Sequence, residues 1–420
     1  MLELEKPLDK LFDKFIHGEA IFRDRDALRP TYVPRNLPYR DEQMNRIGAI
    51  LGPALRGAPP SNLLCYGKTG TGKTVVARYV LDLLVGKAEE SGIRAPMRAY
   101  VNCRIVGTNY RVIRTLCEEI NATMTDGSSV PFTGLPTDEV RSILMKKLEE
   151  APTIFVVVLD EVDNLVKRDQ SQGNDILYGL TRMNSELTNS RISIIGISND
   201  LKFKEMLDPR VLSSLGEEEV IFSPYNAVEL RGILQQRVKL AFTDDAIADD
   251  GVINLVGALA AQEHGDARRA LDLLRTAGEL AERRGEEKVT QEHVREAQKI
   301  IERDTITETV KTLPLQSKAV LFSVYALASD GKRDIFTGEC YNMYVELAKA
   351  LSLDTLTQRR VSDLISELDM LGLINTIVIS KGRYGRTKKI RLAVGKRQIG
   401  NILDEDVRLS KIARELGHDI

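Results

Sequence analysis

This 420-residue sequence contains few of the residues that build metal centres or disulfide frameworks. Its four cysteines include no Cys-x-x-Cys pair and its four histidines are scattered, so neither a zinc site nor disulfide bonds are expected. No apolar run reaches membrane-spanning length, and the first residues lack the basic-then-apolar pattern of a signal peptide. We therefore expect an intracellular, soluble protein with no membrane partner.

Excess charge is also missing, because the formal net charge is only −2. Any surface that binds nucleic acid must therefore be local. Apolar residues make up 43% of the chain and charged residues 29%, which is an ordinary globular balance. The length exceeds that of one typical domain, so two or three domains are expected.

A glycine-rich segment, residues 67–74, fits the phosphate-binding pattern G-x-x-x-x-G-K-[ST]. An apolar strand candidate, residues 63–66, leads into it, and a helix-prone run, residues 75–81, follows. Glycines let backbone N–H groups close around phosphate oxygens, and the start of the helix adds positive potential. Lys73 is expected at the β- and γ-phosphates, and the Thr74 hydroxyl at Mg²⁺. The predicted loop contacts to the nucleotide are Gly70, Thr71, Gly72, Lys73 and Thr74.

Two further strand candidates end in polar residues. Residues 154–159 form a β-branched run typical of a parallel strand buried on both faces, and Asp160 and Glu161 follow it. Ligands bind at the carboxyl edge of such sheets, so Asp160 is expected to hold Mg²⁺ and Glu161 to polarise the attacking water. A third strand, residues 192–198, ends at Asn199, which is expected near the γ-phosphate.

The block Tyr32–Gln43, which reads YVPRNLPYRDEQ, resembles a signature of one group of AAA+ ATPases. These are the archaeal replication initiators related to origin-recognition-complex subunit one and cell-division-cycle protein six. Residues 208–215, 224–225 and 265–271 match the same family. The resemblance covers about residues 10–395, nearly the whole chain. The phosphate loop and the acidic strand are common to many ATPases, whereas the block at residues 32–43 is far more selective.

The resemblance implies an adenine site at Val33 and Pro34, with Arg40 nearby. The histidine that usually precedes this arginine is Tyr39 here. Tyr225 and Arg237 match positions that line the nucleotide in relatives, although a plain hinge role for Tyr225 is left open. Arg210 matches an arginine that reaches a neighbouring subunit's γ-phosphate, and a surface ion pair is its alternative.

The lid is expected to begin near Pro224. Asn226 and Glu229 fit a capping box, and the next helix carries an apolar stripe. Farther on, Asp266 is a candidate N-cap. Arg268 would reach the phosphates from the helix that follows, with Arg269 as the open alternative.

Beyond residue 304 the composition changes, and residues 381–397 contain eight basic residues and no acid. Two strand candidates, residues 373–380 and 389–394, bracket a glycine-rich basic tip. The preceding segment, residues 357–368, has one apolar face. Helix, helix, basic helix, hairpin is the winged-helix order. A solvated surface or a protein-contact module are the competing interpretations of this charge.

Several side chains are expected to contact duplex DNA. Gln358 and Arg359 have the donors to read adenine and guanine edges, with Arg360 beside them. The hairpin tip would enter the minor groove through Arg383, Tyr384 and Arg386. The resemblance adds a helix inserted in the ATPase domain, represented here by Tyr110 and Arg111. Ordinary core packing of Tyr110 is the alternative.

The sequence thus predicts an α/β AAA+ core with a parallel sheet (residues 1–223), an all-α lid (224–304) and a winged-helix domain (305–420). We expect an ATP- and Mg²⁺-dependent initiator that binds origin duplex DNA and hydrolyses ATP to ADP slowly, as a switch. Recruitment of the replicative helicase is implied by the resemblance, and a cytoplasmic, nucleoid-associated location is expected. Neighbouring initiator subunits are left open. The rivals are an AAA+ motor such as a branch-migration helicase, and a signalling ATPase whose winged helix packs on its own core.

Overall fold

The computed structural model describes residues 20–34, 36–150, 152–380 and 386–415. The chain divides into two compact units, Met1–Arg295 and Glu296–Ile420. The division falls inside one continuous helix, α12 (Gln291–Thr312), and residue 304, where the lid was predicted to end, lies in the same helix.

Among the described residues of the first unit, five strands form a parallel sheet in the order β2-β3-β4-β1-β5. The bounds are β1 Leu63–Tyr66, β2 Met97–Asn102, β3 Ile154–Asp160, β4 Arg191–Ser198 and β5 Glu218–Ile221. The strands predicted to precede the phosphate loop, the acids and Asn199 are confirmed as β1, β3 and β4. Because β1, β4 and β3 are adjacent and parallel, the three predicted site segments leave the sheet at the same edge.

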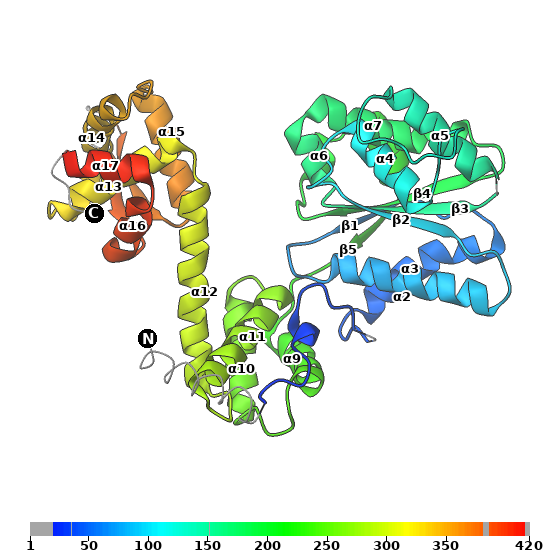
Figure 1. Ribbon diagram of the computed structural model, residues 1–420, viewed down its shortest axis with the longest axis horizontal. Helices are drawn as coiled ribbons and strands as arrows, with labels where there is room; N and C mark the ends of the chain where they lie inside the picture. The colour runs from blue at the N-terminus through cyan, green and yellow to red at the C-terminus, as the bar shows by residue number, and fades with distance from the viewer. Residues whose placement is uncertain (1–19, 35, 151, 381–385, 416–420) are drawn as a thin grey trace, which may run out of the picture. The chain divides into compact units, whose positions relative to one another are not determined.

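Helices cover both faces of this sheet (Figure 1). One face packs on α2 (Asp41–Leu51) and α3 (Lys73–Glu90), around a core that includes Val76 and Ile195. The opposite face packs on α4 (Asn109–Glu119), α5 (Thr137–Glu150) and α7 (Gln170–Arg182). The short helices α6 (Asp163–Arg168) and α8 (Pro209–Leu215) follow β3 and β4 respectively. Every residue of β3 is buried, as the β-branched run predicted.

The lid consists of α9 (Ala227–Ala241), α10 (Asp250–Gln262), α11 (Ala267–Arg284) and the start of α12. The predicted capping box is present, because Asn226 Oδ1 accepts from the Glu229 N–H while the Glu229 carboxylate accepts from the Asn226 N–H. Residues 20–34 also pack on the lid: the rings of Phe22 and Phe242 lie 4.8 Å apart, and Arg25 pairs with Glu282. The segment that precedes the first strand therefore packs against the lid.

The second unit has the predicted winged-helix order. It runs through α13 (Leu315–Ser329), β6 (Ile335–Phe336), α14 (Thr337–Ala350), α15 (Gln358–Met370), β7 (Ile374–Ser380), β8 (Arg386–Leu392), α16 (Lys396–Asp404) and α17 (Val407–Glu415). The strands form an antiparallel sheet in the order β6-β8-β7, and Ser380 pairs with Arg386 across the hairpin. The predicted apolar face of α15 is buried, namely Val361, Leu364, Ile365 and Leu368.

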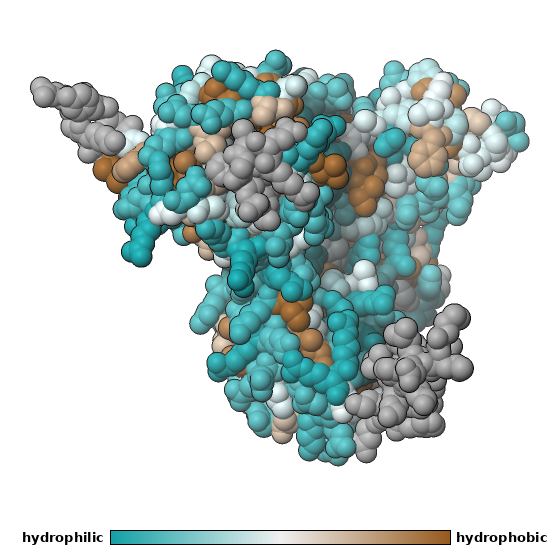
Figure 2. Space-filling view, turned by 60° about the vertical axis from the view of Figure 1, so that its left-hand side comes forward, coloured by the Kyte–Doolittle hydropathy of each residue, from teal (hydrophilic) through white to brown (hydrophobic). Residues whose placement is uncertain are grey.

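The surface drawn in Figure 2 is mostly hydrophilic, with small and separate apolar areas. Across the part of the chain that the structure describes, no helix combines the length and the apolar character needed to cross a membrane.

Candidate functional site

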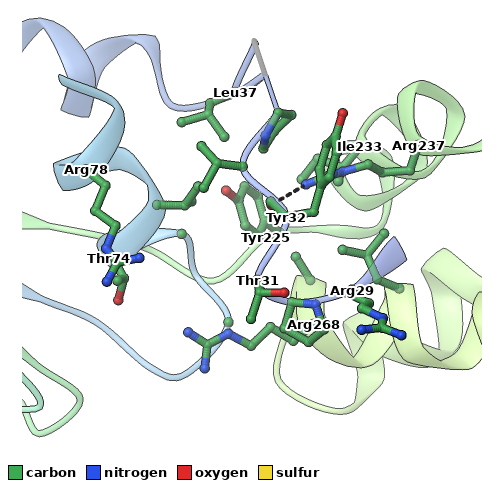
Figure 3. A pocket seen from close by; sticks show the side chains of 18 of the residues that line it. Arg29, Thr31, Tyr32, Leu37, Thr74, Arg78, Tyr225, Ile233, Arg237 and Arg268 are labelled. Carbon is green, nitrogen blue, oxygen red and sulfur yellow. Dashed lines mark hydrogen bonds between the residues drawn. The ribbon is translucent and has the colours of Figure 1, made fainter. Parts of the chain in front are cut away.

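A cavity of about 380 Å³ lies between the sheet edge and the lid (Figure 3). Four segments of the chain line it. They are the stretch before α2 (Arg29–Pro34, Leu37, Pro38), the phosphate loop and α3 (Gly70, Gly72, Thr74, Val75, Arg78), the strand ends (Tyr100, Asn102, Asp160, Glu161) and the lid (Tyr225, Ile233, Gln236, Arg237, Ala267, Arg268, Leu271).

Two glycines of the phosphate loop touch the lid. Gly70 has φ +67°, and a Cβ there would collide with the Asp266 carboxylate at the start of α11. Gly72 has φ +92°, and a Cβ there would meet the Tyr225 hydroxyl at 2.8 Å. The Ala267 N–H also donates to the Gly70 carbonyl, at 3.2 Å. These glycines therefore allow both the cradle for phosphate oxygens and the close approach of the lid.

Lys73 lies inside the loop and is only 5% exposed. Its ammonium donates to the Gly67 and Lys68 carbonyls, at 2.7 and 2.6 Å. Burial is the main influence on this group and lowers its pKa to about 8, although the Asp160 carboxylate opposes that change. The loop thus holds a desolvated cation beside the glycines that would contact phosphate.

Thr74 and Asp160 lie together at the floor of the cavity. The Thr74 hydroxyl donates to Asp160 Oδ2 at 2.9 Å, and the Glu161 N–H donates to Asp160 Oδ1 at 2.9 Å. A hydroxyl and a carboxylate are hard oxygen ligands, and Mg²⁺ is typically held by one or two carboxylates together with substrate phosphates. These two residues therefore fit the predicted metal site.

Glu161 lines the cavity next to Asp160 and has an unusual backbone conformation. Its φ is +52°, in the left-handed region that residues other than glycine rarely adopt. Asn164 Nδ2 donates to both the Glu161 carbonyl and its Oε2, at 3.2 Å each. Backbone strain of this kind is often found at functional sites, where the surrounding structure maintains it.

A charged network joins the ends of β3 and β4. Ser198 Oγ donates to Asp163 at 3.1 Å, and the Lys167 ammonium bridges Asp163 and Asp200, at 2.8 and 2.9 Å. The bond to Lys167 is the largest influence on Asp200 and lowers the pKa of that carboxyl. Asn199 lies between two members of this network, Ser198 and Asp200, and is half-buried. It is not among the described residues that line the cavity.

Arg40 is a buried structural link rather than part of the cavity lining. Its guanidinium donates to the Thr71 carbonyl at 2.9 Å and to the Ser223 carbonyl at 2.7 Å, and it lies 3.7 Å from the centre of the Tyr225 ring. It therefore ties the phosphate loop to the segment that enters the lid. Val33 and Pro34, the two residues that the resemblance places against adenine, line the cavity. Thr71 is fully buried and donates from Oγ1 to the Lys68 carbonyl at 2.9 Å.

Two lid arginines line the cavity (Figure 3). Arg237 donates to the Ala27 carbonyl at 3.0 Å, and its guanidinium lies 4.7 Å from the Tyr32 ring. Arg268 projects from the first turn of α11, whereas Arg269 forms an ion pair with Glu263 at 2.7 Å. The alternatives that the sequence left open are thus separated by position: Arg268 lines the cavity and Arg269 is occupied elsewhere.

Arg210 lies at the start of α8, outside the cavity. It is exposed, pairs with Asp208 at 3.0 Å, and lies 5.0 Å from the Tyr178 ring. Its bond to Asp208 raises the pKa of Arg210 and lowers that of Asp208. Among the described residues, no contact links Arg210 to the cavity lining.

A groove of about 510 Å³ on the winged helix runs between α15 and the hairpin. Gln358 and Arg359 are exposed on its wall, while Arg360 faces Glu367 at 3.9 Å. The remaining lining residues are Thr337, Ser362, Val378, Thr387 and Lys388. The predicted tip residues Arg383 and Tyr384, and the side chain of Arg386, lie outside the described residues.

The basic run that contains no acid in sequence is partly neutralised in space. Lys389 and Arg391 both pair with Asp334, at 2.5 and 2.6 Å. The Lys388 ammonium donates to the Ser362 carbonyl at 3.1 Å, and Lys396 lies against carbonyls at the end of α13. Asp334 therefore offsets part of the positive charge of this run, whereas Lys388 and Lys396 keep their charge.

The segment in which the resemblance implies an inserted helix contains α4. Tyr110 packs against the core beneath it, and its hydroxyl donates to the Pro131 carbonyl at 2.6 Å, which is the packing arrangement weighed as an alternative. Arg111 is exposed. The connection to α5 also presents Phe132, which is 66% exposed, with the Arg114 guanidinium 3.8 Å from its ring centre.

Sequence reasoning missed several residues of the cavity wall, notably Tyr100, Arg78, Arg29 and Gln236. The sequence contained patterns that could have indicated Tyr100 and Arg78. Side chains alternate along a strand, so Tyr100 and Asn102 share one face at the carboxyl end of β2, and β2 is the neighbour of β3. Arg78 lies one helical turn beyond Thr74, which is the spacing of neighbours on a helix surface.

Comparisons with protein families match most of the chain. Residues 36–195 match an AAA ATPase domain, residues 231–299 a Cdc6 AAA+ ATPase-type lid domain, and residues 308–401 a CDC6 C-terminal winged helix domain. The chain is 51% identical over 405 residues to an ORC1-type DNA replication protein of Thermococcus onnurineus, and 50% identical over 404 residues to ORC1-type DNA replication protein 1 of Archaeoglobus fulgidus. Each alignment covers 96% of both chains.

Solved structures show the same architecture. The Aeropyrum pernix ORC1 protein, solved in complex with DNA, superposes with a TM-score of 0.81 at 49% identity, covering 93% of this chain and 99% of that one. Cdc6p from Pyrobaculum aerophilum superposes with a TM-score of 0.58 at 22% identity, covering 94% and 99%, which shows the shared fold.

Proposed function

The chain belongs to the ORC1/Cdc6-type family of archaeal replication initiators, and we propose that it is an ATP-dependent protein that binds origin duplex DNA. ATP or ADP with Mg²⁺ would occupy the cavity between sheet and lid, and the winged helix would bind the duplex. The observation that carries the proposal is this cavity, where the phosphate loop, the paired Thr74 and Asp160 and the lid arginine Arg268 converge.

The residues at the sheet edge have separable roles in this proposal. Lys73 would turn from the loop carbonyls to the β- and γ-phosphates, and Thr74 and Asp160 would hold Mg²⁺, which supplies charge neutralisation when bound. Glu161 would orient the attacking water. Hydrolysis is expected to be slow, as the resemblance implies. It would act as a switch because the lid contacts at Gly70 and Gly72 link loop geometry to lid position.

Apolar members of the cavity lining, namely Val33, Pro34 and Ile233, suit a purine base. Tyr225 also lines the cavity, and its hydroxyl lies close to Gly72 of the phosphate loop. Arg237 would hold the preceding segment through the Ala27 carbonyl. Arg40 would contribute indirectly, by fixing Tyr225 and the loop in their present positions.

The DNA-binding proposal rests on the groove beside α15. Gln358 and Arg359 present amide and guanidinium donors at the exposed start of that helix, the geometry that reads base edges in a major groove. Arg360 would contact the backbone. Arg383, Tyr384 and Arg386 of the hairpin tip remain proposed minor-groove contacts.

Three further elements complete the proposal. Arg111, with Tyr110 positioning α4, would make a second DNA contact from the ATPase domain. Asn199 would sense the γ-phosphate through the network at the end of β4. Arg210, exposed and outside the cavity, would act on the nucleotide of a neighbouring subunit. Recruitment of the replicative helicase would follow assembly on origin DNA in the nucleoid.

A titration on two duplexes tests the DNA assignment. Arg359→Ala should weaken binding to an origin duplex by roughly 1–3 kcal/mol and weaken binding to a scrambled duplex less, because a lost base contact is sequence-dependent. Lys396→Ala is the matched control, since it also removes one positive charge from this unit but its ammonium lies against the Ala328 and Ser329 carbonyls.

Equal losses on the two duplexes would indicate a phosphate contact, and wild-type binding to both would contradict the proposed DNA contact of Arg359. The rival AAA+ motor predicts a different kinetic result. Rapid turnover stimulated by non-specific DNA, together with movement of strands or junctions, would favour that motor over an initiator.

A further inference from the structure

Tyr100 makes a short contact with the acidic residue of the predicted metal site. Its hydroxyl donates to Asp160 Oδ2 at 2.6 Å, and the same oxygen accepts from the Thr74 hydroxyl at 2.9 Å. The other oxygen, Oδ1, accepts from the Glu161 N–H at 2.9 Å. Three donors from three different segments therefore fix the rotation of one carboxylate.

Tyr100 is itself held from the opposite side. The Arg78 guanidinium lies 3.6 Å from the centre of the tyrosine ring, which is the distance of a close cation–π contact. Arg78 projects from α3 on the side of Thr74 (Figure 3). Both Tyr100 and Arg78 line the cavity, and Tyr100 is half-buried. The tyrosine is thus held by a cation at its ring and by the Asp160 carboxylate at its hydroxyl.

We propose that Tyr100 is a positioning residue of the metal site, which holds Asp160 Oδ2 next to the Thr74 hydroxyl before a cation arrives. This inference rests on the Mg²⁺–nucleotide site proposed above and adds a residue to it. A carboxylate that is already oriented has less rotational freedom to lose when it meets a cation. Hydrogen-bond partners behind metal ligands characteristically affect metal affinity by about 10–100-fold when they are removed.

The phenol is suited to this task because it remains a donor. A tyrosine hydroxyl has one proton to donate, and in this structure it donates that proton to Asp160 Oδ2. Lys73 neutralises charge close by but does not hold the carboxylate, because its ammonium donates to the loop carbonyls.

The test is the Mg²⁺ dependence of nucleotide affinity in Tyr100→Phe. Phenylalanine keeps the ring beneath Arg78 and removes only the hydroxyl. The affinity of the full-length protein for a fluorescent ADP analogue would be measured over a range of Mg²⁺ concentrations and in EDTA. We expect the Mg²⁺ concentration at half-maximal enhancement to rise about 10–100-fold, and the affinity in EDTA to stay at the wild-type value.

Tyr341→Phe is the control, because its hydroxyl donates to the Leu356 carbonyl at 3.3 Å in the winged-helix unit. It should leave the Mg²⁺ requirement unchanged. An unchanged requirement in Tyr100→Phe would overturn the inference. So would an equal loss of affinity with and without Mg²⁺, since that pattern indicates a general packing defect. If the nucleotide affinity of the wild-type protein does not depend on Mg²⁺, the proposed metal site itself is contradicted, and the inference with it.

Discussion

Raising the pH should weaken nucleotide binding through Lys73. The ammonium is buried in the phosphate loop, and burial lowers its pKa to about 8. Phosphate oxygens interact with the protonated form, so in the complex the pKa must rise. Nucleotide affinity is therefore at its maximum well below pH 8, and it falls above pH 8 because Lys73 of the free protein loses its proton.

The expected size follows from that pKa. With a value of about 8, Lys73 is about 90% protonated at pH 7 and about 10% protonated at pH 9, so affinity should fall about tenfold between these two pH values. The phosphates of the nucleotide are already ionised over most of this range, since their last pKa lies near 6. Burial raises the pKa of Cys65 to about 12, and that of Tyr100 is also raised, so neither group titrates in the window.

Calorimetric titration at pH 7, 8 and 9, in pairs of buffers with different ionisation enthalpies, measures affinity and proton uptake together. Binding at pH 9 should take up about 0.9 proton, because only about one tenth of Lys73 is protonated beforehand. Lys73→Arg is the control: a guanidinium keeps its charge over the whole range, so its affinity should be lower but independent of pH. A flat profile in the wild type, or a slope that persists in Lys73→Arg, would refute the reasoning.

Two other substitutions separate roles within the cavity. Glu161→Gln should keep nucleotide affinity near the wild-type value, because the shape of the side chain is kept. It should slow hydrolysis by about 10²–10⁴-fold in a single-turnover assay, because the general base is lost. Unchanged hydrolysis would show that Glu161 does not activate the attacking water. Asp266→Ala should lower the free energy of unfolding by about 1 kcal/mol, and it should lower nucleotide affinity because the turn that carries Arg268 becomes looser. Asp266→Asn retains the helix cap and should leave both quantities unchanged. If Asp266→Ala and the wild type bind nucleotide equally in dialysis, this link is contradicted.

The sheet and its ligand edge could be predicted from sequence because both depend on local patterns. A strand buried on both faces needs an unbroken apolar run, and residues 154–159 provide one. The glycines of the loop then imply a turn, and the order of the segments places Asp160 close to Thr74. The N-cap at Asp266 and the capping box at Asn226 are equally local, and both are present.

Side-chain choices that depend on tertiary packing were beyond such patterns. Arg268 and Arg269 are about 100° apart around α11, and only the packing of the lid decides which one enters the cavity. In the same way, Lys389 and Arg391 lie in a run without acids, yet the pairing of β6 with β8 brings Asp334 to both of them. Counting charges along the chain cannot include a partner that lies more than fifty residues away.

The cavity and the junction between sheet and lid are built from the same groups. Arg40 bonds to the Thr71 carbonyl in the phosphate loop and to the Ser223 carbonyl at the entry to the lid, and Asp266 of the lid lies against Gly70. A nucleotide that rearranges the loop to accept its phosphates must therefore disturb contacts that also fix the lid. Arg40, which the resemblance places near the adenine site, also lies 3.7 Å from the centre of the Tyr225 ring. We therefore expect any coupling between bound nucleotide and lid position to pass through these shared groups.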